Sequence, residues 1–205
     1  MKLADLTLAQ FLDALASSDP TPGGGTASAV AGAMATSLLV MVTGLAKSNT
    51  NSAEEKSALA AARQALRPLG TTLSALAETD AAAFDEVMSA YRLAKATDDE
   101  KAARSAAIQK ALQGATMAPL HTLRACAESM AKAGAVAASG NRSAVSDVGV
   151  AIGLIEAAAA GAEANVRINL GSVRDRRFAS ATGDETSRLV AEVTRRAAAA
   201  RARLA

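Results

Sequence analysis

The stretch "DPTPGGGTASAVAGAMATSLLVMVTGLAKSN", Asp19–Asn49, joins three consecutive glycines to a long run of residues without charge. Gly, Ala, Ser and Thr fill more than half of that run. Residues this small let helix backbones approach one another closely, because little side-chain volume separates them. We therefore predict a central helix over about 26–46 that is buried on all sides within a helical bundle.

A membrane span is one alternative for this stretch, because a span needs about 20 apolar residues. The many small and hydroxyl-bearing residues argue against a span, and no second segment of similar length lacks charge. Four charged residues interrupt the next best segment: Asp147, Glu156, Glu163 and Arg167. We therefore expect a protein that does not enter a membrane.

A phosphate-binding loop is the other alternative. A Walker loop needs a lysine directly after its last glycine to reach the phosphates, whereas Gly25 is followed by Thr26. Two interpretations of the glycines stay open. Gly23–Thr26 forms either an ordinary tight turn or a place where a ligand approaches the free N–H groups of a helix start.

The rest of the chain has the 3.6-residue periodicity of helices and no alternating strand pattern. Three helix starts carry capping-box pairs: Thr7 with Gln10, Ser52 with Glu55, and Thr97 with Glu100. The helices are expected at about 7–17, 26–46, 53–94, 98–137, 144–170 and 183–204, with bends near Pro68 or Gly70 and near Pro119, and with a turn at "SGNRS". The sequence thus predicts an all-α fold, a bundle of long Ala-rich helices forming a single domain over residues 1–205.

The composition limits partners and location. The chain has one Tyr, three Phe and no Trp, so its apolar helical faces exceed what one thin bundle can cover, and we expect a homodimer. The net charge of +2 is too small to indicate nucleic-acid binding. Arginine is concentrated between Arg174 and Arg203, where interspersed acids favour a solvated helical face over an anion site. Asp5 and Asp13 interrupt any secretory signal, so we expect a cytoplasmic protein.

The sequence gives little support for a metal site or for a catalytic nucleophile. His121 is the only histidine and Cys126 the only cysteine, which makes a zinc site improbable and leaves no pair for a disulfide. The two lie five residues apart, about 140° around a helix, so they do not form a dyad. We interpret both as core or surface residues and predict no metal site.

An acidic cluster lies within "ETDAAAFDEVMSAYRLAK", Glu78–Lys95. Asp80, Phe84, Met88, Tyr91 and Lys95 follow at helical spacing, and the apolar members predict that this face is buried. An acid on a buried face is either paired or functional. Asp80 and Lys95 lie about 22 Å apart along a straight helix, so they cannot share one substrate atom.

A second polar cluster comes later in the chain. Asn141, Ser146 and Asp147 surround a predicted helix start, where an acid favours the positive end of the helix dipole. Asn165 and Asn169 are four residues apart on one helix face. Buried amides need partners, so these side chains bind either one another or a polar heterocycle.

Seven segments in order resemble the cyclodeaminase/cyclohydrolase family, which includes the cyclodeaminase domain of formiminotransferase-cyclodeaminase and bacterial methenyltetrahydrofolate cyclohydrolases. The segments are "PTPGGGTASAVAGAMA", "DAAAFDEVMSAYRLAK", "DEK", "AIQKAL", "PLHTLRAC", "GNRSAVSDVGVA" and "NVRINL". The resemblance runs from about Leu6 to about Arg203. It implies a helical homodimer with folate bound near the subunit interface, and neither a metal nor a cofactor beyond the folate substrate.

The resemblance also implies roles for individual residues. Asp80 occupies the position of the family's catalytic acid. The substrate-binding positions that it implies, together with the lysines expected to hold the glutamate carboxylates of the folate, are Pro22, Gly23, Gly24, Gly25, Lys47, Lys95, Asn141, Ser146, Asp147, Asn165 and Asn169. The arginines late in the chain are the alternative to Lys47 and Lys95 for these carboxylates. The implied activity is cyclodeamination of 5-formiminotetrahydrofolate, hydrolysis of 5,10-methenyltetrahydrofolate, or both, on substrates that include polyglutamylated forms.

The chain departs from the family pattern at two places. It has Leu93-Ala94-Lys95 where the family commonly has L-P-K, and after the buried helix it keeps Lys47 but lacks the second Lys and the Tyr of G-K-K-x-Y. These departures leave a second hypothesis open, a non-catalytic helical dimer that binds folate or a protein partner. Absorbance of the methenyl form distinguishes the two hypotheses, because only an enzyme changes it.

Overall fold

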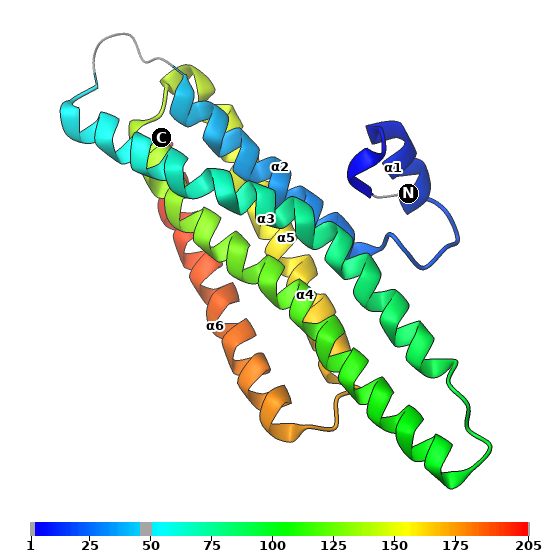
Figure 1. The fold of residues 1–205 in the computed structure, drawn as a ribbon. Helices are drawn as coiled ribbons and strands as arrows, with labels where there is room; N and C mark the ends of the chain where they lie inside the picture. Colours follow the sequence, from blue (N-terminus) through cyan, green and yellow to red (C-terminus); the bar gives the residue numbers. More distant parts are fainter. Residues whose placement is uncertain (1–2, 46–50, 205) are drawn as a thin grey trace.

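The computed structural model describes residues 3–45 and 51–204, and within them it contains helices and no strand. The elements are η1 (Leu3–Asp5), α1 (Leu8–Leu15), α2 (Gly24–Gly44), α3 (Ala53–Tyr91), α4 (Asp98–Ser139), η2 (Arg142–Ala144), α5 (Val145–Leu170) and α6 (Arg176–Arg201). Helices α2 to α5 form an elongated bundle, α6 packs along α4 and α5, and α1 projects from the body (Figure 1). The predicted all-α fold is confirmed.

The three capping boxes form as the sequence predicts, at Thr7, Ser52 and Thr97. In each, the hydroxyl accepts a hydrogen bond from a backbone N–H and the acid or amide three residues later binds back, which satisfies groups that a helix start leaves unpaired. Helices α3 and α4 are 39 and 42 residues long and continue through Pro68 and Pro119. This length lets both helices connect the two ends of the bundle.

Close contacts between small residues hold α2 inside the bundle. A Cβ atom on Gly161 of α5 would lie 2.1 Å from Oγ of Ser28, and one on Gly32 would lie 3.1 Å from a methyl carbon of Leu73 and 3.2 Å from Sγ of Cys126. An added Cβ at either position would force its neighbours to shift, so glycine at these two positions lets α2, α3, α4 and α5 pack this closely. The small residues of α2 therefore allow close helix contacts, as the sequence predicts.

The prediction that α2 is buried on all sides is wrong. Met34 is 53% and Met41 41% exposed, two turns apart on one side of the helix. The reason is that α3, α4 and α5 surround α2 on its other sides only. The run without charge thus supplies a buried face, made of Gly, Ala, Ser and Thr together with Leu39 and Val42, and an exposed apolar stripe.

Two segments are long and apolar enough to cross a membrane by length and composition, Gly24–Gly44 and Arg142–Leu170. The second segment meets this criterion although it carries the charged residues noted from the sequence. Half of the most apolar window in the first segment and 39% of that in the second is buried inside the bundle. Core helices meet the same criterion, so the finding is weak support for a membrane protein.

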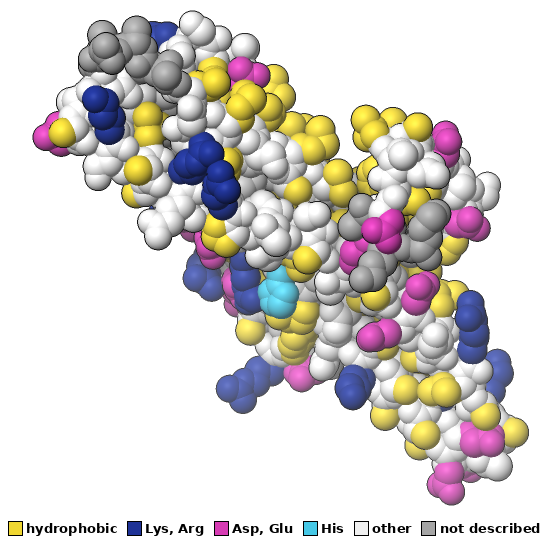
Figure 2. Space-filling model, turned by 45° about the horizontal axis from the view of Figure 1, so that its top comes forward, with side chains coloured by type: hydrophobic (Ala, Val, Ile, Leu, Met, Phe, Trp, Pro, Cys, Tyr) yellow, Lys and Arg dark blue, Asp and Glu magenta, His cyan; other side chains and the backbone are white. Residues whose placement is uncertain are grey.

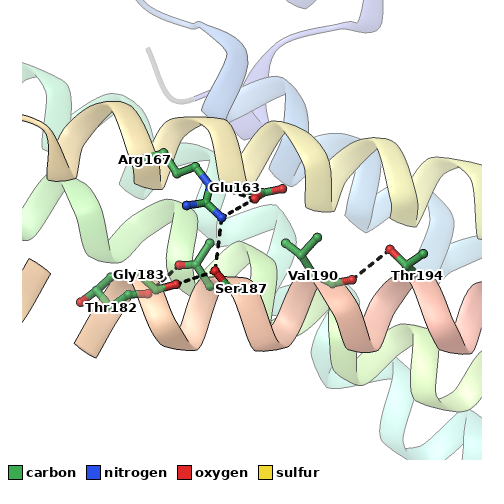
Figure 3. Close-up of polar contacts among 8 residues, drawn as sticks. Glu163, Arg167, Thr182, Gly183, Ser187, Val190 and Thr194 are labelled. Atoms are coloured by element: carbon green, nitrogen blue, oxygen red, sulfur yellow. Dashed lines mark hydrogen bonds and ion pairs between the residues drawn. The ribbon is translucent and has the colours of Figure 1, made fainter. Parts of the chain in front are cut away.

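Helix α6 begins seven residues earlier than predicted, at Arg176 instead of 183. The side chain of Asp175 accepts a hydrogen bond from the backbone N–H of Phe178 at 3.0 Å and so caps the helix. The helix packs against α5 partly through Arg167, which pairs with Glu163 on its own helix and donates to Oγ of Ser187 at 3.3 Å (Figure 3). Gly183, near the predicted start, lies inside α6.

Candidate functional site

The centre of the candidate site is the carboxylate of Asp80 on α3, which faces the beginning of α2. Thr26 Oγ1, fully buried in the first turn of α2, donates a hydrogen bond to Oδ2 of Asp80 at 3.0 Å. Burial raises the pKa of Asp80 above its usual range, and the hydrogen bonds from Thr26 act in the opposite direction. Asp80 is therefore a half-buried acid that holds its proton more tightly than an exposed aspartate does.

Gly25 lies against this carboxylate. A Cβ atom at Gly25 would be 2.2 Å from Oδ1 and 2.6 Å from Cγ of Asp80, so a side chain there would displace the acid. Gly23 is the N-cap of α2, and it has no side chain to cap the helix start. The backbone N–H of Thr26 instead bonds to Asp80, and together with the positive end of the helix dipole it favours a negative charge on the acid. The last glycine is more than part of a turn, because it makes room for Asp80.

A cavity of about 390 Å³ opens beside Asp80 and gathers segments that are far apart in the sequence. Six of the predicted site residues line it: Gly23, Gly24, Gly25, Asp80, Asn165 and Asn169. Its other walls come from the turn before α2 and from apolar side chains: Pro20, Thr21, Phe84, Val87, Leu112, Ala115, Ile168 and Ser172. The cavity therefore combines one acid, two amides and a helix start with an apolar wall.

The two amides are anchored and still have binding capacity. Asn165 Nδ2 donates to the carbonyl of Gly161 at 2.8 Å, and Asn169 Nδ2 donates to the carbonyl of Ala115 at 2.9 Å. They bind backbone carbonyls and not one another, so the first of the two partners expected from the sequence is not found, and binding to a polar heterocycle stays a prediction. Among the described residues nothing else pairs with either side chain, so each has an oxygen acceptor and one N–H for a ligand.

Other predicted binding residues lie away from this cavity in the single chain. Asn141 Oδ1 accepts from the backbone N–H of Ser143 at 2.9 Å and so caps η2. Ser146 and Asp147 begin α5, about 27 Å along that helix from Asn165. Pro22 precedes the lining glycines but does not line the cavity itself. Lys47 lies outside the described residues.

The predicted face from Asp80 to Lys95 is only partly formed. Phe84 and Met88 are half-buried as expected, but Tyr91 is 46% exposed, and Lys95 follows the end of α3 and is exposed. The reason is that the end of α3 and the start of α4 extend beyond the other helices of the bundle (Figure 1). Asp85 is exposed, so the acid five residues after Asp80 belongs to the opposite, solvated face.

His121 and Cys126 contribute nothing to this cavity. Cys126 is completely buried, and burial raises the pKa of its thiol to about 12, so it stays protonated. His121 is exposed, and its pKa is lowered by partial burial and by Arg124. In the part of the chain that the structure describes, no three His, Cys, Asp or Glu residues gather in a group that could hold a metal ion.

The hydrogen bond from Thr26 to Asp80 was not predicted from the sequence. Thr26 and Asp80 are 54 residues apart, and nothing in the local pattern of either indicates a contact. A buried threonine in the first turn of α2 is equally typical of core packing. Only the antiparallel packing of α2 and α3 brings the two together.

A family model described as formiminotransferase-cyclodeaminase matches residues 7–188 of this chain. The chain belongs to this family. The match includes the segments that carry Gly25, Asp80 and both lining asparagines. The cavity therefore lies entirely within the part of the chain that defines the formiminotransferase-cyclodeaminase family.

Individual members of this family are similar over most of the chain. A methenyltetrahydrofolate cyclohydrolase of Methylorubrum extorquens is 43% identical over 186 residues, which cover 91% of this chain and 89% of that one. A formimidoyltransferase-cyclodeaminase of Gallus gallus is 30% identical over 90% of this chain, but the match spans only 34% of that longer protein. The chain thus corresponds to about a third of the bird protein.

A solved structure in the family has the same fold. The crystal structure of a formiminotetrahydrofolate cyclodeaminase from Thermotoga maritima superposes with a TM-score of 0.87 and 27% identity, and covers 99% of this chain and 98% of that one. The resemblance inferred from the seven sequence segments is confirmed.

Proposed function

We propose that this chain is an enzyme of tetrahydrofolate one-carbon metabolism that hydrolyses 5,10-methenyltetrahydrofolate to 10-formyltetrahydrofolate. The observation that carries the proposal is the half-buried Asp80 carboxylate with a raised pKa, at the edge of a cavity that has amides and an apolar wall. The 43% identity to a methenyltetrahydrofolate cyclohydrolase over most of both chains supports the choice of reaction.

The chemistry proposed for Asp80 is proton transfer beside a cation. In the methenyl substrate one carbon joins N5 and N10 and shares a positive charge with them. Ionised Asp80 attracts this cation and accepts a proton from the water that adds to the carbon. The resulting tetrahedral intermediate opens when Asp80 returns that proton to N5 and the carbon–N5 bond breaks. The hydroxyl proton then leaves through the carboxylate, and a formyl group remains on N10.

The raised pKa suits this double role, because a group that must both accept and release a proton works best when its pKa is near the working pH. A bound cation would lower the pKa of Asp80 again and keep it ionised until water attacks. Asn165 and Asn169 are proposed to bind the donors and acceptors on the pterin edge. The proposed mechanism uses only the substrate, water and side chains of this chain.

Cyclodeamination of 5-formiminotetrahydrofolate is the second candidate, favoured by the similarity to the Thermotoga maritima cyclodeaminase. In that reaction N10 attacks the formimino carbon on N5, and ammonia leaves after it gains a proton. The reacting carbon is bonded to the same two nitrogens, so the same acid could supply the proton. The site geometry is compatible with both reactions.

One experiment decides among these possibilities. The purified protein is mixed separately with the methenyl and the 5-formimino substrate, and absorbance of the methenyl group is followed. A fall with the first substrate supports the hydrolase, and a rise with the second supports the cyclodeaminase. Unchanged absorbance with both, combined with a mobility shift that shows binding, would instead support a non-catalytic folate-binding dimer.

We also propose that the protein is a cytoplasmic homodimer. The support is exposed apolar surface: Leu8 and Leu12 on α1 and the stripe of Met34 and Met41 on α2 are open to solvent in the single chain. Figure 2 shows hydrophobic side chains along this side of the body and on the projecting N-terminal lobe. Burial in a self-association interface would remove this surface from water. Sedimentation as a monomer at micromolar concentration would contradict the dimer.

A further inference from the structure

A second cavity, of about 430 Å³, adjoins the candidate site near the ends of α3 and α4. Leu112 and Ser172 line both cavities, so the two share a wall. Along α3, Asp80 lines the first cavity and Tyr91 the second, about 16 Å further along the helix axis. Arg104 of α4 lies at the distant end of this path.

Two guanidinium groups line the second cavity, and both are held by neutral partners. Arg104 donates from Nε and Nη2 to the carbonyl of Tyr91 at 3.2 and 3.0 Å, and it lies 5.6 Å from the centre of the Tyr91 ring. Arg174 donates from Nη1 to Oγ of Ser105 at 2.8 Å. Among the described residues neither guanidinium is paired with a carboxylate. Two positive charges therefore line this cavity without a matching negative charge.

The segment that carries Arg174 is fixed to α4. Gln109 Nε2 donates to the carbonyl of Ser172 at 3.1 Å, and Gln109 Oε1 accepts from the backbone N–H of Arg174 at 2.7 Å. This pair of bonds holds the turn between α5 and α6 against the side of the cavity. Arg174 is thus placed by the fold, although its side chain is exposed.

The properties of the walls change in order along the two cavities. At one end lies the acid Asp80, in the middle lie the apolar side chains of Phe84, Val87 and Leu112, and at the other end lie the two arginines. Tetrahydrofolate has the matching order of groups. Its one-carbon unit carries positive charge in the methenyl form, its aminobenzoyl ring is flat and apolar, and its glutamate has negative carboxylates.

We propose that Arg104 and Arg174 bind the glutamate carboxylates of the folate, an inference that rests on the proposed function. Guanidinium groups bind carboxylates through two parallel N–H···O bonds, which makes them well suited to this role. The subsite sets which folate forms the enzyme selects and takes no part in proton transfer. It selects Arg174 from the late arginines, for which the sequence left both a solvated face and glutamate binding open, and it adds Arg104 of α4.

The test compares two substrates that differ only in the glutamate. Turnover of 5,10-methenyltetrahydrofolate is measured against that of 5,10-methenyltetrahydropteroate, which lacks the glutamate. For the unmodified protein we expect kcat/KM to be about tenfold or more higher with the glutamate. In Arg174→Gln and in Arg104→Gln this preference should fall at least about threefold, and in the double variant it should nearly vanish. Arg176→Gln, an exposed arginine two residues away that lines neither cavity, should keep the full preference.

The outcomes separate this inference from the proposed function. If the unmodified protein turns over neither substrate, the proposed function is wrong. If it turns over both with equal kcat/KM, or if the arginine variants keep its preference, the glutamate subsite is wrong while the activity stands. Because Arg104 also binds the end of α3, thermal unfolding is measured for each variant. Should Arg104→Gln fail to fold, Arg174→Gln alone decides, since among the described residues the Arg174 side chain bonds only to Ser105.

Discussion

Gly25 and Asp80 share one space: a Cβ atom on Gly25 would lie 2.2 Å from Oδ1 of the Asp80 carboxylate. The Gly25→Ala variant must therefore push the acid away and break its hydrogen bond to Thr26. We expect kcat to fall by about 10² or more, because proton transfer depends on the position of the acid. Gly114→Ala is the matched control, since Gly114 does not line the cavity and its Cβ would have nothing within 4 Å. Equal loss of activity in both variants would show that the geometry around Gly25 is not what matters.

Asp80→Asn tests the acid itself. The amide has nearly the same shape as the carboxylate but cannot take a proton from water, so we expect kcat for the preferred folate reaction to fall by about 10² to 10⁴. Asp85→Asn is the control on the same helix, because Asp85 is exposed, and its rate should change less than about threefold. Steady-state kinetics of both variants provide the measurement. Full activity in Asp80→Asn would mean that another group transfers the proton.

The same substitution should make the protein more stable at neutral pH. Burial raises the pKa of Asp80 in the folded protein above the unfolded value near 3.8, so the folded state binds the proton more tightly. The free energy of unfolding contributed by this group is therefore highest below the unfolded pKa and falls as pH rises through the folded pKa. Asp80→Asn removes that loss. Thermal unfolding should show a higher midpoint for the variant at pH 7 and a difference that shrinks toward pH 4. A lower midpoint at pH 7 would contradict this account.

Two glycines of α5 should respond in opposite ways to alanine. A Cβ at Gly161 would lie 2.1 Å from Oγ of Ser28, whereas one at Gly153 has nothing within 4 Å. Gly161→Ala should therefore lower stability by about 1–3 kcal/mol, because Ser28 must turn away from the carbonyl of Gly24 or α2 and α5 must shift apart. Gly153→Ala should raise it by about 0.5–1 kcal/mol, since alanine loses less conformational entropy in a helix. Urea unfolding measures both, and a destabilising Gly153→Ala would point to a contact across an interface between subunits.

Local chemistry explains which parts of the fold could be predicted. Capping boxes and alanine-rich periodicity depend only on neighbouring residues, so most helix bounds were correct to within a few residues. The start of α6 was missed because its cap, Asp175, lies among arginines that suggested only a solvated surface. The exposed side of α2 was missed for another reason, since it depends on which helices surround α2.

In the candidate site, too, features that depend on neighbouring residues were predictable and features that depend on helix packing were not. Asp80 was predictable because an acid at helical spacing among apolar residues lies on a buried face, where acids are either paired or functional. Its contact with Thr26 was not, because packing of two helices brings together residues that share no local pattern. Lys95 was misplaced on the Asp80 face because α3 ends four residues before it. The roles of all these residues stay predictions until the variants are measured.

The reactivity of Cys126 reports how often the bundle opens. Its sulfur is completely buried and adjoins the backbone of α2 at Gly32, so a thiol-specific reagent cannot reach it while the helices stay together. As the only cysteine of the chain, it yields a single labelling signal. The rate at which that signal grows in the native protein measures how often α2 and α4 separate, without denaturant and without any label added to the sequence.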